Sequence, residues 1–131
     1  MKSTIAFFVL LVLLAGTGFN CRRTGIPLRV TTIKGKIVYV GCSTDVIQVL
    51  EGTVDTAHLA KTWKFYQTDS TYTNVFSVGN YCDFRNLGFK VNDVLTFTIK
   101  DTTAVNSCVE CLVFDGAPRV YDVVSNVKKI N

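Results

Sequence analysis

The chain is poor in the residues that build helices and most active sites. Its 131 residues include only two Glu, six Ala, one His, one Met and one Trp. With two Pro and nine Gly it is neither collagen-like nor of low complexity. The shortage of Glu and Ala argues against a helical domain. By contrast, 19 Val and 16 Thr favour pleated strands, and 48% hydrophobic residues exclude a disordered chain.

Motifs for the common chemistries are missing as well. The sequence has no Gly-x-Ser-x-Gly turn, no phosphate-binding glycine loop and no Asp-rich calcium loop. His58 is the only histidine, which is too few for a histidine zinc site, and we interpret it as a surface or helix-end residue. The ten acidic residues are scattered, mostly in turns. We therefore expect no catalytic residue, no metal and no cofactor.

The net charge of +4 is small, and no dense basic stripe of the kind that binds nucleic acid is present. Arg22, Arg23 and Arg29 cluster near the start of the expected mature chain. We interpret them as part of a solvated tether, the alternative being attraction to anionic lipid head groups. The charge pattern therefore predicts no nucleic-acid partner.

The N-terminus has the three parts of a secretory signal. Lys2 gives a positive start, residues 5–15 form an apolar run of eleven, and small residues follow at 16–18. A bilayer-spanning helix needs about 20 apolar residues, and a buried core helix would show a polar face. We expect an exported protein with a signal peptide at 1–20, a tether at 21–28 and a single domain at 29–131.

Cys21 directly follows this signal, at the place where bacterial lipoproteins carry their acceptor cysteine. Phe19 and Asn20 stand where the usual motif has small residues, and the segment most resembles the relaxed signals of Bacteroidetes-type lipoproteins. The resemblance implies lipidation of Cys21 and anchoring to a membrane of the cell envelope. The alternatives are a secreted or periplasmic protein cleaved near residues 16–18, or a Cys21 that pairs between molecules.

The other four cysteines are Cys42, Cys82, Cys108 and Cys111, an even number that suits two disulfides in an oxidising compartment. Residues Val109–Phe114 are expected to form a strand. Positions three apart in a strand face opposite sides, so Cys108 and Cys111 should pair with Cys42 and Cys82 rather than with each other. A Cys-x-x-Cys redox centre lacks the helix that would follow its first thiol, and a zinc site lacks its second Cys-x-x-Cys pair.

Alternating apolar and polar residues indicate short strands along most of the chain. One short helix is expected at Asp55–Ala60, capped by Asp55 or Thr56, and residues 80–93 read as a long connection. The expected strands are 29–41 with a bend or bulge near Gly35, 45–50, 61–66, 74–78, 94–100, 109–114 and 119–130.

This succession of strands, with a glycine bend in the first, resembles an OB-fold. Residues Phe89–Val94 resemble the turn before an OB strand, and the resemblance covers most of residues 30–130. It implies an all-β domain built as a small closed or partly open antiparallel β-barrel, with a β-sandwich as the alternative.

Aromatic residues are the remaining candidates for binding. We expect most of them to fill the core, and Trp63, Tyr66 and Tyr81 to be the exposed members. The sequence thus favours a non-enzymatic, exported, membrane-anchored β-domain with a binding or structural role, whose partner is a glycan, a peptide or an envelope protein. The alternatives are a secreted thiol–disulfide oxidoreductase using Cys108 and Cys111, and a freely secreted ligand-binding or inhibitor module.

Overall fold

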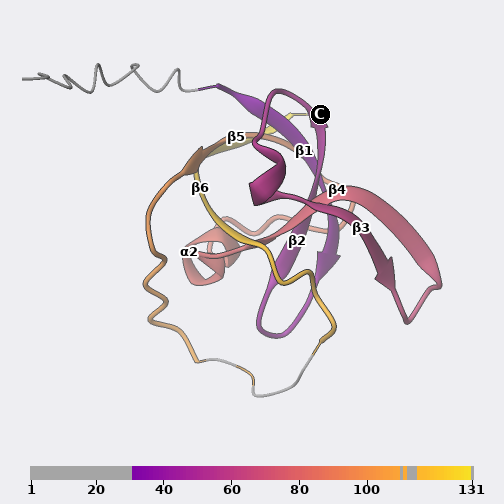
Figure 1. The fold of residues 1–131 in the computed structure, drawn as a ribbon. Helices are drawn as coiled ribbons and strands as arrows, with labels where there is room; N and C mark the ends of the chain where they lie inside the picture. Colours follow the sequence, from indigo (N-terminus) through magenta and orange to yellow (C-terminus); the bar gives the residue numbers. More distant parts are fainter. Residues whose placement is uncertain (1–30, 110, 112–114, 131) are drawn as a thin grey trace, which may run out of the picture.

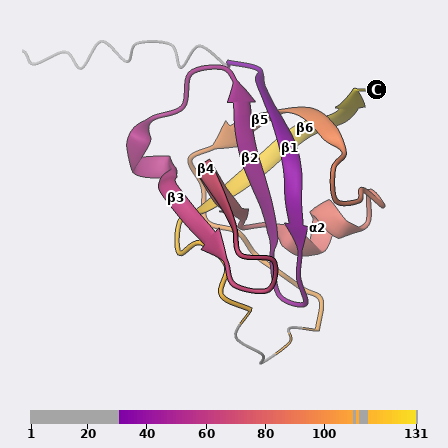
Figure 2. The same ribbon diagram turned by 90° about the vertical axis from the view of Figure 1, so that its right-hand side faces the viewer.

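The computed structural model describes residues 31–109, 111 and 115–130. The expected signal peptide, the tether and Cys21 lie outside these residues. The described part is all-β, as expected, with a single mixed sheet and very little helix (Figures 1 and 2). Its elements are β1 (Ile33–Val40), β2 (Asp45–Glu51), η1 (Thr56–His58), β3 (Ala60–Phe65), β4 (Ser70–Val78), α2 (Tyr81–Arg85), β5 (Val94–Lys100) and β6 (Tyr121–Ile130).

Five strands pair in a ring, in the order β1-β2-β4-β6-β5 and back to β1. The β3–β4 hairpin extends outward from this ring (Figure 1). Four contacts of the ring are antiparallel, but β4 and β6 are parallel, with Val78 opposite Asp122. The expected barrel-like arrangement is therefore present, but the sheet is mixed rather than purely antiparallel. Parallel neighbours need a long crossover, which α2, β5 and residues 101–120 supply.

Two hydrophobic clusters lie on opposite sides of the same strands. The larger cluster includes the fully buried Phe76 and Phe97. The second contains Val46 and Val75, packed with Trp63 of β3. Because each of these valines is next to a residue of the larger cluster, β2 and β4 are buried on both faces. The second cluster is thus a small hydrophobic core on the outer face of the ring.

The irregularity expected near Gly35 is present in the β1–β2 ladder, but the extra residue belongs to β2. The register shifts between Lys34, opposite Glu51, and Gly35, opposite Val49, so Leu50 is the additional residue. A Cβ atom on Gly35 would lie 2.6 Å from Cγ2 of Ile47 and 2.9 Å from the backbone oxygen of Gln48. Glycine is required here because the neighbouring strand leaves no room for a side chain.

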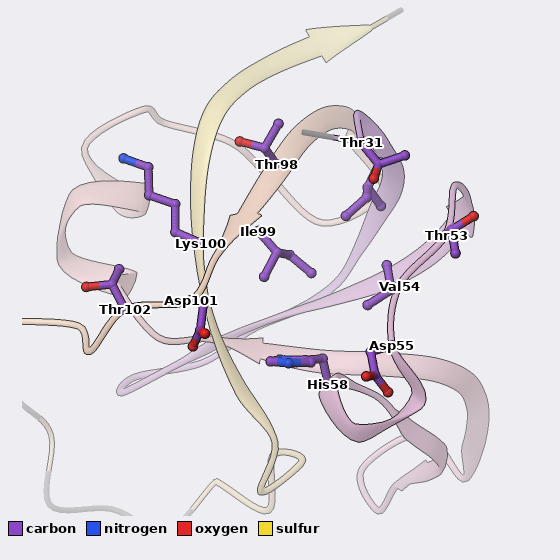
Figure 3. Close-up of a pocket in the computed structure, with 11 residues that line it drawn as sticks. Thr31, Thr53, Val54, Asp55, His58, Thr98, Ile99, Lys100, Asp101 and Thr102 are labelled. Carbon is purple, nitrogen blue, oxygen red and sulfur yellow. The ribbon is translucent and has the colours of Figure 1, made fainter. Parts of the chain in front are cut away.

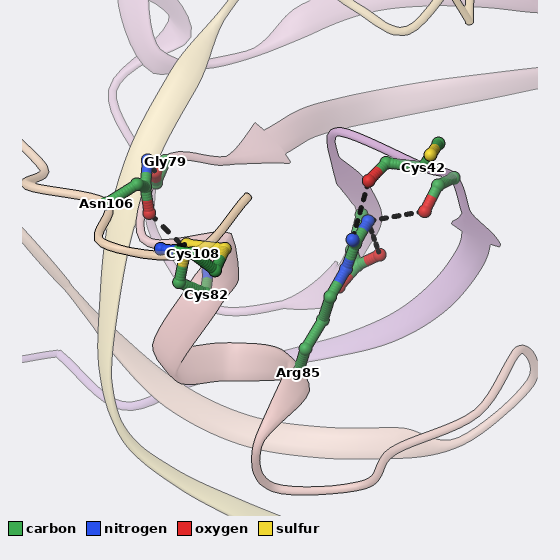
Figure 4. Close-up of a disulfide and its surroundings, with 8 residues drawn as sticks. Cys42, Gly79, Cys82, Arg85, Asn106 and Cys108 are labelled. Carbon is green, nitrogen blue, oxygen red and sulfur yellow. Dashed lines mark hydrogen bonds and ion pairs between the residues drawn. A yellow bond between two sulfur atoms is a disulfide. The ribbon is translucent and has the colours of Figure 1, made fainter. Parts of the chain in front are cut away.

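Both disulfides join the connection between β5 and β6 to another part of the domain. Cys42–Cys111 links it to the β1–β2 turn, and Cys82–Cys108 links it to α2 (Figure 4). The expectation that Cys108 and Cys111 pair with the other two cysteines is confirmed. The pairing was inferred from a strand expected at 109–114, and that premise is wrong in part, because Val109 and Cys111 have no regular structure. Residues 110 and 112–114 lie outside the described part. Two disulfides indicate an oxidising, exported environment.

The helical segments differ from the expectation. The segment expected as a helix over Asp55–Ala60 is the 3-10 helix η1, and Asp55 caps it by accepting a hydrogen bond from the N–H of Ala57 at 2.9 Å. The connection at 80–93 contains α2, which the sequence did not predict. Five helical residues are too few to show a 3.6-residue period, and they are held by tertiary packing of Tyr81, Cys82 and Phe84.

Replacement of Gly35 by alanine should destabilise the domain by about 2–3 kcal/mol, because the new methyl group overpacks a strand contact that involves backbone. Gly88→Ala is the matched control. It meets nothing within 4 Å but has a φ of 72°, so it should cost only about 1 kcal/mol. Urea unfolding of the two variants measures the difference, and equal losses would contradict the tight contact at Gly35.

Candidate functional site

A groove with a volume of about 770 Å³ lies beside η1, between the start of β1 and the end of β5 (Figure 3). Figure 2 shows η1, beside the groove, and α2 on opposite sides of the ring. The described lining of the groove consists of four threonines, two aspartates and three aliphatic residues, together with His58 and Lys100. The aliphatic members are Ile33, Val54 and Ile99. Such a surface offers apolar contact and polar atoms together, as ligand sites commonly do.

The loop that follows β2 forms one wall of the groove. Gly52 begins it with a φ of 110°, and a Cβ there would lie 3.2 Å from the Cα of Ile33. Glycine therefore allows the loop to turn close to β1. Asp55 then caps η1, and His58 is the last residue of that helix. The local sequence thus places Val54, Asp55 and His58 along one side of the groove (Figure 3).

His58 is paired with a buried carboxylate. Its Nδ1 lies 2.6 Å from Oδ1 of Asp122, whose side chain is only 4% exposed. The other carboxylate oxygen, Oδ2, is buried and has no hydrogen-bond partner among the described residues. Asp122 stands at the parallel contact with β4, where its carbonyl accepts a hydrogen bond from the N–H of Gly79 at 2.7 Å. The closure of the ring therefore positions the carboxylate that holds His58.

The hydrogen bond from His58 to Asp122, and the negative charge of Asp122, raise the pKa of His58 above its ordinary value. The carboxylates of Asp55 and Asp101 act in the same direction, whereas burial acts against them. Burial raises the pKa of Asp122, and the hydrogen bond to His58 opposes that rise. The surroundings of His58, with Asp122 bonded to its ring and Asp55 and Asp101 near it, thus favour the protonated form of the imidazole relative to a free histidine.

The His58–Asp122 pair has the form of the base and orienting carboxylate of a hydrolytic triad. A triad also needs a nucleophile, and the described lining of the groove contains neither serine nor cysteine. Thr98, one of the lining threonines, is engaged with Ser125, their hydroxyl oxygens being 2.8 Å apart. The described lining therefore presents the His58–Asp122 pair without a serine or cysteine beside it.

The three aromatic residues expected to be exposed have different environments. Tyr66 is 61% exposed, as expected, whereas Trp63 and Tyr81 are 7% and 5% exposed. Trp63 is buried because β3 folds over the outer face of the ring, where its Nε1 donates to the carbonyl of Gly116 at 2.8 Å. Tyr81 lies in α2, and the guanidinium carbon of Arg85 is 5.2 Å from the centroid of the Tyr81 ring. The expectation of exposed Trp63 and Tyr81 rings is therefore wrong.

Arg85 holds the β1–β2 turn against α2 (Figure 4). Its guanidinium donates to the carbonyl of Cys42 at 2.6 Å and to the carbonyl of Gly41. It also lies 3.4 Å from the carboxylate of Asp45, which is 2% exposed. Burial raises the pKa of Asp45, and Arg85 opposes the rise. All of these contacts are within the domain, so Arg85 has a structural role beside the Cys42–Cys111 disulfide.

Two residues of the groove region were not expected to be functional. His58 was interpreted as a surface or helix-end residue; it does end η1, but it is also paired with Asp122. Asp122 was counted among the scattered acids. The available signal was its position in the last strand, where it shares a face with the buried Val124. An acid at an inward position of a strand needs a partner, and the only histidine was a candidate for it.

Comparison with protein-family models, with curated proteins and with solved structures finds no match. In the described ranges, no group of three or more His, Cys, Asp or Glu is placed to hold a metal ion. No helix within the same residues is long and apolar enough to cross a membrane. Cys108 and Cys111 belong to two different disulfides. The groove is therefore the candidate site that the geometry itself indicates.

The His58–Asp122 pair should make the domain lose stability as the pH rises above the ordinary histidine pKa of about 6.5. Because folding raises the pKa of His58, protonation of His58 stabilises the folded state. This stabilisation is complete at pH values below the pKa of the unfolded chain, about 6.5, and it is lost as the pH rises through the pKa of the folded protein. His58 is the only histidine, so this loss should disappear in His58→Gln. Asp122→Asn should lower the pKa of His58, as measured by NMR titration, because it removes the largest cause of the rise. An unchanged pKa in Asp122→Asn would show that Asp122 does not hold the imidazole.

Proposed function

We propose that this chain is a non-enzymatic, exported binding domain, anchored to a membrane of the cell envelope by lipid on Cys21. The observation that carries the binding role is the groove, which combines an aliphatic surface, threonine hydroxyls and a histidine held by a buried carboxylate. Two disulfides support a location outside the reducing cytoplasm. The ring of five strands supports an OB-like architecture, in which ligand sites are common.

A redox function receives less support. A Cys-x-x-Cys redox centre forms its disulfide between its own two cysteines, whereas Cys108 is bonded to Cys82 and Cys111 to Cys42. Both bonds hold the β5–β6 connection in place. We therefore assign these four cysteines a structural role in the proposal, and the membrane anchor and the groove carry the function.

The anchor is tested by the intact mass of the mature protein from its native host. We expect a chain that begins at Cys21 and carries added acyl mass, found in the membrane fraction. Cys21→Ser should release the protein from that fraction. Without the lipid, only the nearby arginines would attract the protein to the membrane, and that attraction is weak. A native chain without acyl mass, or one cleaved before residue 19, would contradict the anchor and leave the freely secreted alternative.

The groove is tested by blocking it. Thr53 is exposed and lines the groove, so Thr53→Trp should fill it without disturbing the core, and Thr71→Trp on the exposed face of β4 is the matched control. Isotope-labelled domain is titrated with a peptide digest of envelope proteins and, separately, with envelope oligosaccharides. We expect one of the two to shift NMR signals of groove residues in the wild type and in Thr71→Trp but not in Thr53→Trp. Shifts confined to another surface, or none with either mixture, would contradict a binding groove.

A further inference from the structure

One wall of the groove is a strand edge that the ladder leaves unpaired. The β1–β5 ladder ends where Ile33 pairs with Phe97. On its other side, β5 continues to pair with β6 as far as Lys100 opposite Val123. In the described part of the chain, residues 98–100 therefore have a strand neighbour on the β6 side only. All three residues also line the groove.

The peptide groups of Ile99 point toward the open side of this edge. Val124 lies opposite Ile99, and its N–H and C=O are both bonded to the side-chain amide of Asn80, at 2.9 and 3.0 Å. Val124 therefore turns its peptide groups away from β5. In an antiparallel ladder the two residues of such a pair both point outward, so the N–H and C=O of Ile99 face away from β6.

The opposite side of β5 gives the same orientation. Ile37 of β1 accepts a hydrogen bond from the N–H of Asn92 at 2.8 Å and donates its N–H to the carbonyl of Asp93 at 3.0 Å. Ile33 lies four residues earlier in β1, so its N–H and C=O also point toward β5. Phe97 is the partner of Ile33, and its N–H and C=O point toward β1. Ile99, two residues after Phe97, presents its N–H and C=O on the same side, beyond the last β1–β5 pair.

The side chains around this edge have a consistent chemistry. Ile99 and Val54 lie on opposite sides of the groove, and Asp101, His58 and Asp55 lie at one end of it (Figure 3). Lys100 points away from these carboxylates (Figure 3). His58 lies between Asp101 and Asp55 (Figure 3), and its ring is paired with the buried carboxylate of Asp122. A strand added at this edge would thus find an aliphatic position beside Ile99 and, beyond that pair, the carboxylates of Asp101 and Asp55.

We propose that the groove binds an extended peptide segment, which adds to the edge of β5 as a short strand. An aliphatic residue of the peptide lies against Ile99 and Val54, and a basic residue lies beside Asp101 and Asp55. Main-chain bonds to Ile99 supply affinity, and the two side-chain positions supply selectivity. This inference rests on the proposed function and names its ligand class. An oligosaccharide lacks the alternating N–H and C=O groups that a strand edge pairs with.

The test uses the mature protein and a displayed library of random peptides. We expect the selected peptides to share an aliphatic residue and a Lys or Arg near it. Asp101→Asn should weaken their binding about twofold to fivefold, because it removes one exposed charge pair. Asp83→Asn, the same change at an exposed position of α2, should leave binding unchanged. A loss of equal size in both variants would contradict the contact with Asp101.

Hydrogen exchange at the amide of Ile99 tests the strand edge directly. In the free mature protein this amide should exchange much faster than that of Phe97, and a selected peptide should slow it by about tenfold or more. Slow exchange in the free protein would mean that the chain covers its own edge, which overturns the proposal. Peptides that bind without slowing Ile99 would overturn the added strand but leave the groove as a binding site. Groove signals that respond only to oligosaccharides would overturn the peptide class and leave the proposed function standing.

Discussion

The parallel contact between β4 and β6 is the constraint on which the rest of the structure depends. The antiparallel hairpins of the domain join strands that are close in sequence, but β6 reaches β4 only after residues 101–120. Fixing a connection of this length has a large entropic cost, and both disulfides act on it. In the chain-entropy model, loops of 69 and 26 residues correspond to about 4.4 and 3.5 kcal/mol. Ser77 adds a hydrogen bond from its hydroxyl to the carbonyl of Pro118 at 2.7 Å.

The same contact determines where the candidate site can form. Asp122 is the residue that pairs with Val78 across the parallel contact, and its carboxylate is buried beneath His58. If β6 were displaced, His58 would lose its partner and the groove would lose the group that orients its imidazole. Stability and the candidate site therefore depend on one closure of the ring.

Local patterns predicted much of the fold. The alternation in residues 94–100 predicted β5 with Leu95 and Phe97 buried, and the glycine at 35 marked the place where the β1–β2 register shifts. Burial of Trp63 was not predictable in this way. A two-residue period shows which residues share a face, but it does not show that β3 folds over the outer face of the ring. The groove was missed for a related reason, since its walls come from three segments that are far apart in sequence.

Two disulfides, Cys42–Cys111 and Cys82–Cys108, hold the connection that closes the ring. A peptide map of the unreduced mature protein tests this pairing. Cleavage after Glu110 separates Cys108 from Cys111, and tryptic cleavage after Arg85, Lys90 and Lys100 separates Cys82 from Cys108. After both digestions we expect one linked peptide pair containing Cys42 and Cys111 and another containing Cys82 and Cys108. A peptide pair joined through Cys108 and Cys111, or free thiols at these positions, would contradict it.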